Sequence, residues 1–328
     1  MTDLLPLLRD NLLSPPILFF ALGVGARMAR SDLEVPREIG RALAIYLMIS
    51  IGFKGGTAVA DAGASWTLAS GCAAVVLLGT VLTVIAFALL RWVVGVDTVN
   101  AASVAAHYGS VSAVTFLTAA AFLDRLREPY EGYMVALMAL MEIPAIFVGL
   151  FLAHVLAPQR AGTGLVWPDV LREALFNGSV ILLAGSLMIG AIVGVDGGRS
   201  VEAFLVAPFQ GILALFLLDM GLLAARRAAD FRRMGGRLVA FGVVMPLLGA
   251  PLGLITGRLL GFDAGGTTLL AVLAASASYI AVPAAMRLGL PQANPGLGVS
   301  LALGVTFPLN IVLGLPLYYQ IAQLLAAM

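Results

Sequence analysis

The sequence predicts an all-α membrane protein that crosses the bilayer ten times as a 5+5 inverted repeat with broken helices. Its 328 residues are 61% hydrophobic and only 11% charged, and the mean hydropathy is +1.02. Soluble domains carry about 25% charged residues, so this composition excludes a sizeable soluble domain. Apolar windows recur along the whole chain, and two polar stretches inside such windows match each other across the two halves.

Ten apolar windows are each long enough to cross the hydrocarbon core of a bilayer, which takes about 20 residues. The first window is short and contains Pro15 and Pro16, so its start is the least defined. In chain order, we expect membrane-spanning helices at 14–30, 40–62, 66–91, 98–123, 132–157, 169–194, 201–224, 237–260, 265–287 and 297–324.

The basic residues predict how these spans are oriented. With ten spans, the odd-numbered loops lie on one side of the membrane, and both termini lie on the other. Thirteen arginines fall in the odd loops and five on the opposite side. Because basic residues concentrate in the cytoplasm, we expect a multi-pass protein of the bacterial inner membrane with both termini extracellular or periplasmic. The thirteen are Arg27, Arg30, Arg37, Arg41, Arg91, Arg160, Arg172, Arg226, Arg227, Arg232, Arg233, Arg237 and Arg287.

The two halves of the chain resemble each other in sequence. Since each half holds five spans, an odd number, the second half must enter the membrane upside down relative to the first. We therefore expect a first repeat at 1–157, a short cytoplasmic linker at 158–168 and a second, inverted repeat at 169–328. The matches are Val104–Val114 with Leu273–Pro283, Met141–Pro144 with Val305–Pro308 and, more weakly, Phe53–Gly56 with Leu218–Gly221.

The first of these matches places polar groups near the middle of the membrane. Helices rise about 1.5 Å per residue, so residues ten to twelve positions into a span lie near the midplane of a core about 30 Å thick. Gly109 and Pro283 predict a break in each span, and each break leaves a half-helix N-terminus that attracts anions. The alternative is that the hydroxyls bond back to their own helix and Gly109 only permits close packing. The expected anion-binding residues are Gly109, Ser110, Ser112, Thr115, Ser276, Ser278 and Tyr279.

Glu142 brings a carboxylate to the same depth. Pro144, two positions later, frees a backbone carbonyl one turn upstream. Carboxylate, carbonyl and hydroxyl oxygens suit Na⁺ or a transferable proton, whereas the alternative is a protonated carboxyl that hydrogen-bonds to a neighbouring helix. The expected cation ligands are Glu142, Ser112, Thr306 and Asn310. His107 is open to two interpretations, a proton relay or a neutral, hydrogen-bonded imidazole.

Lys54 and Asp219 occupy equivalent positions in the two repeats and carry opposite charges. One interpretation is an intramembrane ion pair across the pseudo-two-fold axis, which removes two costly isolated charges. The other is that the Lys54 side chain extends outward to the interface and Asp219 lies near the cytoplasmic end of its span.

Several of these segments are similar to one transporter family. His107–Phe116, Met141–Ala145 and Ala275–Met286 followed by Pro291–Pro295 resemble the sodium-dependent bicarbonate transporters of cyanobacteria and their bacterial relatives, with Phe53–Gly56 as a further marker. The resemblance covers nearly the whole chain. It implies ten spans, core and gate subdomains, a homotrimer embedded in membrane lipid, and bicarbonate uptake with Na⁺ as the coupling ion. It also implies a regulatory partner, the small PII-like signalling protein that binds the cyanobacterial transporters.

The chain departs from the cyanobacterial pattern within the expected site. Glu142 stands where that group has an aspartate before Ile-Pro, and the segment Ser276–Tyr279 lacks the aspartate that ends the cyanobacterial serine-rich run. The cyanobacterial Ser-Gly-Ser corresponds here to Ser112–Val114, with one hydroxyl fewer. These changes alter the charge and the ligands that an anion or a cation meets.

The expected function is Na⁺-coupled symport of a small monovalent anion, with bicarbonate as the substrate that the resemblance implies. Few intramembrane charges argue against a polyvalent anion. Transport of another small carboxylate and cation/proton antiport through Glu142 are the alternatives. An intramembrane serine hydrolase would need a nucleophile motif matched to His107 or His154, and none is present, so we expect no enzyme. A single cysteine, Cys72, excludes disulfides, and a net charge of +1 gives no sign of a nucleic-acid partner, so we expect none.

Overall fold

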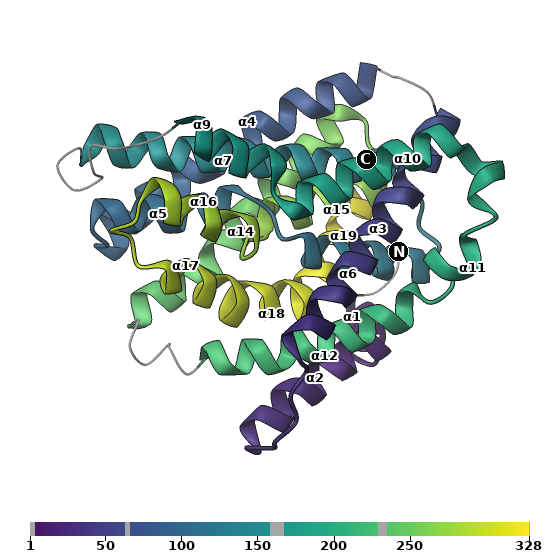
Figure 1. The fold of residues 1–328 in the computed structure, drawn as a ribbon, viewed down its shortest axis with the longest axis horizontal. Helices are drawn as coiled ribbons and strands as arrows, with labels where there is room; N and C mark the ends of the chain where they lie inside the picture. The colour runs from purple at the N-terminus through teal and green to yellow at the C-terminus, as the bar shows by residue number, and fades with distance from the viewer. Residues whose placement is uncertain (1–3, 63–65, 158–166, 229–234, 328) are drawn as a thin grey trace.

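The computed structural model describes residues 4–62, 66–157, 167–228 and 235–327, and every regular element within these ranges is helical (Figure 1). Two regions of interest therefore lie outside it: most of the expected linker at 158–168, and the basic residues Arg160, Arg232 and Arg233. The α-helices are α1 (Leu4–Leu12), α2 (Pro15–Met28), α3 (Arg37–Ala62), α4 (Trp66–Ala88), α5 (Thr98–Gly109), α6 (Ala113–Leu126), α7 (Met134–Leu156), α9 (Trp167–Phe176), α10 (Gly178–Gly198), α11 (Glu202–Leu205), α12 (Phe209–Ala228), α14 (Gly236–Leu260), α15 (Ala264–Ala275), α16 (Ala281–Gly289), α17 (Pro295–Leu301), α18 (Phe307–Leu309) and α19 (Leu315–Ala326), and the π-helical segments are η1 (Leu89–Val94), η2 (Ala302–Thr306) and η3 (Asn310–Gly314).

Eight helical stretches in the described part of the chain are long and apolar enough to cross a membrane. A ninth is obtained if α1 and α2, which meet at an angle of 59°, count as one bent span. The expected window at 265–287 is divided between α15 and α16, and neither half has the length of a span. The eight stretches are Arg37–Ala60, Trp66–Val94, Thr98–Leu126, Met134–Leu156, Gly178–Gly198, Glu202–Arg227, Gly236–Leu260 and Pro295–Ala326.

Each half of the chain begins with a short helix that the sequence analysis did not identify. α1 lies before the first expected span, at 14–30, and most of α9 lies inside the sixth, at 169–194. α1 ends at Leu12 before Pro15 and Pro16, which cannot donate backbone N–H groups inside a helix but fit the first turn of a new one. In the second half, α9 ends at Phe176, and α10 starts at once because the Asn177 side chain accepts from the N–H groups of Ser179 and Val180. The two short helices therefore end for different reasons.

Two helix pairs join the halves of the chain through glycines, α2 with α12 and α3 with α10. In the first pair, a Cβ atom on Gly23 would overlap the carbonyl oxygen of Leu218, and one on Gly221 would overlap that of Phe20. Only glycine therefore allows these backbones to approach so closely, as is common between membrane helices.

The α3–α10 pair repeats this arrangement. A Cβ atom on Gly56 would overlap the carbonyl oxygen of Leu187, and one on Gly190 would overlap that of Phe53. Gly56 and Gly221 are the two glycines that end the weak sequence match between the halves. In both pairs, the first span of one half packs against the second span of the other half. In both, glycines allow the close approach of the two backbones.

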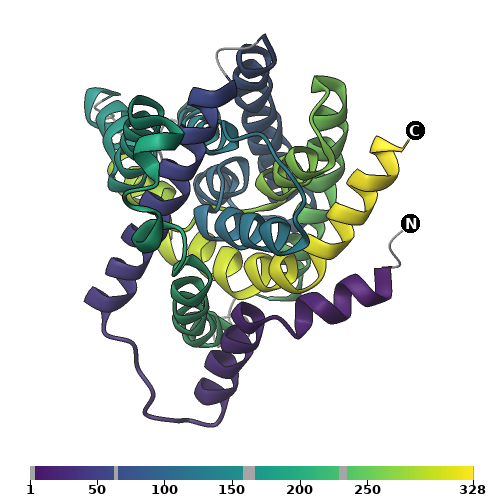
Figure 2. The ribbon, with the colours of Figure 1, turned by 90° about the vertical axis from the view of Figure 1, so that its right-hand side faces the viewer.

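The broken stretch α5–α6 lies at the centre of the remaining helices. Its 18-residue apolar window is entirely buried, the highest share of any candidate span in the described residues. Helices α4, α7 and α15 pack around it, and α14 and α19 pack on α15. Figure 2 shows this group end-on, with the α3–α10 and α2–α12 pairs to one side. Burial in protein is what a span with interrupted backbone hydrogen bonds requires inside a membrane.

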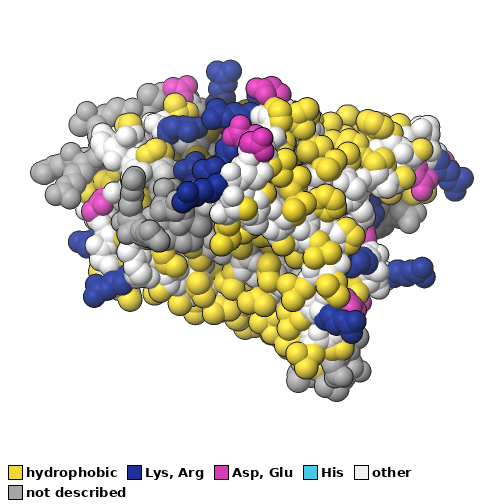
Figure 3. All heavy atoms as spheres, turned by 90° about the horizontal axis from the view of Figure 1, so that it is seen from below, with side chains coloured by type: hydrophobic (Ala, Val, Ile, Leu, Met, Phe, Trp, Pro, Cys, Tyr) yellow, Lys and Arg dark blue, Asp and Glu magenta, His cyan; other side chains and the backbone are white. Residues whose placement is uncertain are grey.

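The chain ends lie near each other, with α1 packed on α19 (Figure 2). The buried Asn11 side chain donates to the carbonyl oxygen of Ile311 at 2.9 Å and so fastens α1 to the last span. On the outer surface, Figure 3 shows a broad hydrophobic area with Lys, Arg, Asp and Glu side chains at its margins. That distribution is expected of a surface that faces lipid between two aqueous edges.

Candidate functional site

The first helix break lies where the sequence analysis predicted it. α5 ends at Gly109, Ser110 is extended (φ −86°, ψ −177°), and α6 begins at Ala113 with Ser112 as its N-cap. The Ser112 hydroxyl accepts from the N–H of Thr115 at 3.2 Å. Gly109 is required for packing as well, because a Cβ atom there would overlap the Thr83 hydroxyl on α4.

The second break is also at the predicted place. α15 ends at Ala275, Ser276 is extended (φ −88°, ψ 172°), and α16 begins at Ala281. Pro283 is the third residue of α16, so its missing N–H falls among the four that have no partner within a helix. The Asn310 side chain donates to the carbonyl oxygen of Ala275 at 2.8 Å and satisfies one of the free carbonyls at the end of α15.

The two breaks cross and bond to each other. The N–H of Ser278 donates to the carbonyl oxygen of His107 at 2.8 Å, and His107 Nδ1 lies 2.6 Å from the carbonyl oxygen of Ser278. Because a carbonyl oxygen only accepts, Nδ1 must carry the proton in that contact. The N–H of Ser112 donates to the Ser276 hydroxyl at 2.9 Å. His107 therefore links the two halves of the chain through hydrogen bonds. This agrees with its interpretation as a hydrogen-bonded imidazole.

Three buried oxygens at the crossing have no hydrogen-bond partner among the described residues: Ser110 Oγ, Thr115 Oγ1 and Glu142 Oε2. Their side chains are at most 3% exposed. Leaving a buried polar atom unpaired costs about 1–3 kcal/mol, so three in one place are informative. The N-terminus of α6, between Ser110 and Thr115, adds its own free N–H groups and the positive end of its helix dipole.

A small cavity, with no room for a water molecule, joins the two breaks to α7 and α10. It is lined by the polar residues Glu142, Ser112, Ser278, Tyr279 and Ser179. The structure thus brings four predicted site residues together and adds Ser179 of α10. The sequence analysis missed Ser179 because this residue lay inside the span expected at 169–194, with no sign of a helix start there. A carboxylate with several hydroxyls is the oxygen ligand set that a hard cation prefers.

Thr306 and Asn310, the other two predicted cation ligands, do not line this cavity in the described structure. The Thr306 hydroxyl donates to the carbonyl oxygen of Gly242 at 2.8 Å and lies 2.7 Å from the Tyr108 hydroxyl. Asn310 uses both ends of its amide, since its oxygen accepts from Tyr318 at 2.9 Å while its nitrogen binds the end of α15. Both side chains therefore have partners that hold the breaks in place.

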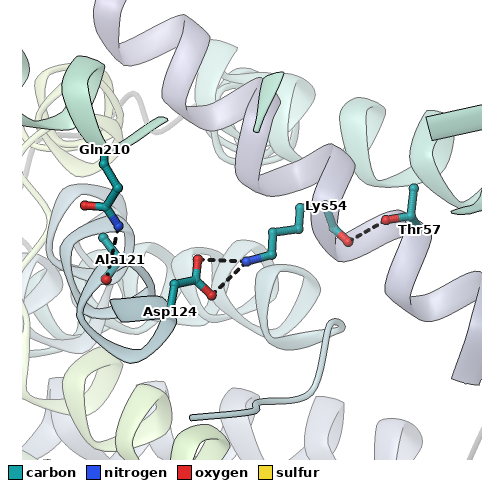
Figure 4. A network of polar contacts seen from close by, with 5 residues as sticks. All are labelled: Lys54, Thr57, Ala121, Asp124 and Gln210. Carbon is teal, nitrogen blue, oxygen red and sulfur yellow. Dashed lines mark hydrogen bonds and ion pairs between the residues drawn. The ribbon is translucent and has the colours of Figure 1, made fainter. Parts of the chain in front are cut away.

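Of the two interpretations of Lys54 and Asp219, the ion pair between them is wrong. Lys54 Nζ on α3 lies 2.7 Å from each carboxylate oxygen of Asp124 on α6 (Figure 4). Asp219 on α12 instead faces Gly40, where an added Cβ atom would lie 2.6 Å from its Oδ2. Gly40 and Lys54 are fourteen positions apart on α3, about 21 Å along the helix, so one lysine cannot reach both carboxylates.

The Lys54–Asp124 pair links the glycine-paired helices to the central group. The ring of Tyr130 lies 5.6 Å from Nζ, and Gln210 of α12 donates to the carbonyl oxygen of Ala121 at 3.2 Å beside it (Figure 4). The lysine and aspartate side chains are 42% and 33% exposed, so this is a partly solvated ion pair. No sequence signal indicated this ion pair. Its two residues are far apart in the chain, and no matched segment contains both of them.

Comparison with known proteins adds one finding. Residues 15–323 match the family model described as the Na⁺-dependent bicarbonate transporter superfamily. No curated protein matches the chain at the threshold of the search. The matched region contains both helix breaks, Glu142 and both members of the Lys54–Asp124 pair.

Proposed function

Because the chain belongs to the Na⁺-dependent bicarbonate transporter superfamily, we propose that it is a Na⁺-coupled symporter for a small monovalent anion, with bicarbonate as its substrate. It is a multi-pass membrane protein, and its family makes it a transporter rather than an enzyme. The observation that carries the proposal is the crossing of two helix breaks beside three unpaired buried oxygens.

The anion binds at the start of α6 in this proposal. Ser110 and Thr115 have hydroxyls without a partner in the described structure, and both flank the free N–H groups of that helix end. Hydroxyl and N–H donors around a helix N-terminus replace the hydration of a small anion. Ser276 and Ser278 of the second break support the same pocket through their bonds to Ser112 and His107. A singly charged oxyanion suits a site without an arginine.

The coupling Na⁺ binds next to the anion in this proposal, in the cavity lined by Glu142, whose walls must move apart to admit it. The free Oε2 of Glu142 and the hydroxyls of Ser112, Ser179 and Ser278 give the oxygen-rich ligand set that Na⁺ requires. Ser112 belongs to both sites, since it caps α6 and lines the cavity. A cation beside the anion offsets the cost of carrying charge into a medium of low dielectric, so each ion raises the affinity for the other.

Movement between the two helix groups gives alternating access. We propose that 1–157 and 169–328 are inverted repeats, that α2, α3, α10 and α12 form the gate, and that the helices around α5–α6 form the core. The repeated glycine packing of α2 with α12 and of α3 with α10 supports this division. The same proposal includes ten spans, termini outside the cytoplasm, a bacterial inner-membrane location, a homotrimer and a PII-like regulator.

Counter-flow of labelled bicarbonate in proteoliposomes tests the proposal. Protein-containing vesicles should exchange bicarbonate when Na⁺ is present and should lose at least about tenfold in rate when choline replaces it. Exchange of another small carboxylate with the same Na⁺ dependence would keep symport and correct the substrate. Na⁺-driven proton movement without any anion would instead establish the antiport alternative, which the unpaired Oε2 of Glu142 favours.

A further inference from the structure

A large cavity lies beside the Lys54–Asp124 ion pair, away from the helix crossing. Its volume is about 750 Å³, and helices α2, α3, α6, α11 and α12 contribute to its lining. It shares no lining residue with the cavity at Glu142. Its occupant therefore has to be inferred from its own walls and not from the transport site.

The walls of this cavity are mainly apolar. Phe19 of α2, Leu205 of α11 and Phe209 and Leu215 of α12 contribute to them, together with Ile51 of α3. Bicarbonate, with one carbon and three oxygens, has no apolar part to place against such walls. Cavities of about 300–1,000 Å³ with apolar walls and a few polar groups typically hold organic molecules.

The charged groups of the cavity favour an anion. Of the described residues that line it, Lys54, Arg125 and Asp124 are charged, which leaves one positive charge in excess. Lys54 is neutralised by Asp124. Asp10 of α1 acts electrostatically on Arg125, but no carboxylate among the described residues lies within 4 Å of the Arg125 guanidinium. That guanidinium lies 5.5 Å from the centre of the Phe122 ring. Arginine forms bidentate hydrogen bonds with carboxylates, and Asp124 would repel a second negative charge.

We propose that this cavity is a second binding site, which takes an organic monocarboxylate with an apolar chain. Its carboxylate binds Arg125 and shares Lys54 with Asp124, and its chain lies along Phe19, Phe209 and Leu215. The bound molecule contacts α2, α3 and α12 on one side and α6 on the other. Because it lies between helices of the two groups, it inhibits transport without competing for the anion site.

Binding of radiolabelled octanoate to the full-length protein in nanodiscs tests this site, with neither Na⁺ nor bicarbonate present. Octanoate should bind saturably, and octanol, which has the same chain without the charge, should compete at least about tenfold more weakly. Arg125→Gln should weaken octanoate binding at least about tenfold, whereas Arg127→Gln, two positions away and outside the lining, should not. Equal competition by octanol, or unchanged affinity in Arg125→Gln, would overturn the proposal and leave a cavity that only accepts hydrocarbon.

A cavity-filling substitution gives a second, independent measurement. Gly211 lines the cavity, and a Cβ atom there would meet nothing within 4 Å, so Gly211→Leu should fold and remove octanoate binding. Gly185→Leu on α10 is the matched control, because that glycine is also free of neighbours within 4 Å and does not line the cavity. Octanoate binding that survives Gly211→Leu, or that is lost equally in Gly185→Leu, would contradict the assignment.

Discussion

His107 and Ser278 bond to each other twice across 171 positions of sequence. The Ser278 N–H donates to the His107 carbonyl oxygen at 2.8 Å, and the His107 ring nitrogen Nδ1 lies 2.6 Å from the Ser278 carbonyl oxygen. Each residue therefore satisfies backbone groups that the helix break of the other half leaves free. This reciprocal pair fixes the crossing and leaves the hydroxyls of Ser110 and Thr115 without partners in the described structure.

Those two hydroxyls allow a test that separates binding from folding. Ser110→Ala and Thr115→Val should leave the free energy of unfolding unchanged or raise it by up to about 1 kcal/mol, because each removes an unpaired buried polar group. The same changes should reduce anion uptake by about tenfold or more. Thermal unfolding in detergent and uptake into proteoliposomes measure the two effects. Thr118→Val is the control, since the Thr118 hydroxyl bonds only to the Val114 carbonyl oxygen of its own helix, at 2.8 Å. Wild-type uptake by both test variants would remove the anion site from this place.

The glycine contacts predict a sharp contrast between two positions on α10. Gly190→Ala should destabilise the protein by about 1–3 kcal/mol, because the added Cβ atom overlaps the Phe53 carbonyl oxygen of α3. Gly185→Ala should be neutral or stabilising by up to about 1 kcal/mol, because nothing lies within 4 Å of its Cβ position and alanine favours helix. The unfolding midpoints of the two purified variants measure this difference in stability. Similar midpoints for the two variants would mean that the α3–α10 packing is looser than described.

The Lys54–Asp124 pair should show coupling in a double-mutant cycle. Lys54→Ala and Asp124→Ala each strand one charge, so their combined cost should be less than the sum of the single costs. Because both side chains are partly exposed, we expect a coupling energy of about 1 kcal/mol, well below that of a fully buried pair. The cycle of Lys54→Ala with Asp219→Ala is the control and should be additive. Coupling to Asp219 of equal size would restore the pairing that the structure contradicts.

The orientation can be tested by cysteine labelling. In a Cys72→Ser background, a cysteine at Ser31, between α2 and α3, should react with an impermeant maleimide only from the cytoplasm. A cysteine at Glu128, between α6 and α7, should react only from outside. Reaction of both positions from the same side would exclude the odd-to-even alternation of loops and, with it, the inverted repeat. The other loop chosen from the sequence, at Ala229, lies outside the described residues.

Local sequence signals predicted the helix breaks well. At the first break Gly109 ends one helix and the Ser112 hydroxyl caps the next, and at the second Pro283 fits the first turn of a new helix. These preferences act within a few positions. The same holds for most of the long apolar helices, whose ends lie near the predicted limits. The exception is α10, which begins at Gly178 and not at 169, because the separate helix α9 precedes it. Residues that line the Glu142 cavity were predicted in part, because depth along a span constrains which groups can meet.

Contacts between distant helices could not be predicted in this way. Asn310 and Thr306 have the right depth for cation ligands, but the sequence does not reveal that Ala275 and Gly242 offer carbonyl oxygens to them. The partner of Lys54 depends equally on how α3 and α6 pack. Repeat symmetry suggested Asp219, yet equivalent positions in two repeats need not touch, and Asp219 packs against Gly40, fourteen positions from Lys54 along α3.

The most direct test of the account is the Na⁺ dependence of uptake in Glu142→Gln. The amide keeps the volume of the side chain and removes the charge that holds Na⁺ beside the anion in our proposal. In the wild type, Na⁺ should activate bicarbonate uptake at least about tenfold. Glu142→Gln should fold normally and lose this activation, whereas Glu142→Asp should keep part of it. Uptake is measured in proteoliposomes over a range of Na⁺ concentrations. If Glu142→Gln transports the anion with unchanged Na⁺ activation, the carboxyl is structural and the cation binds elsewhere.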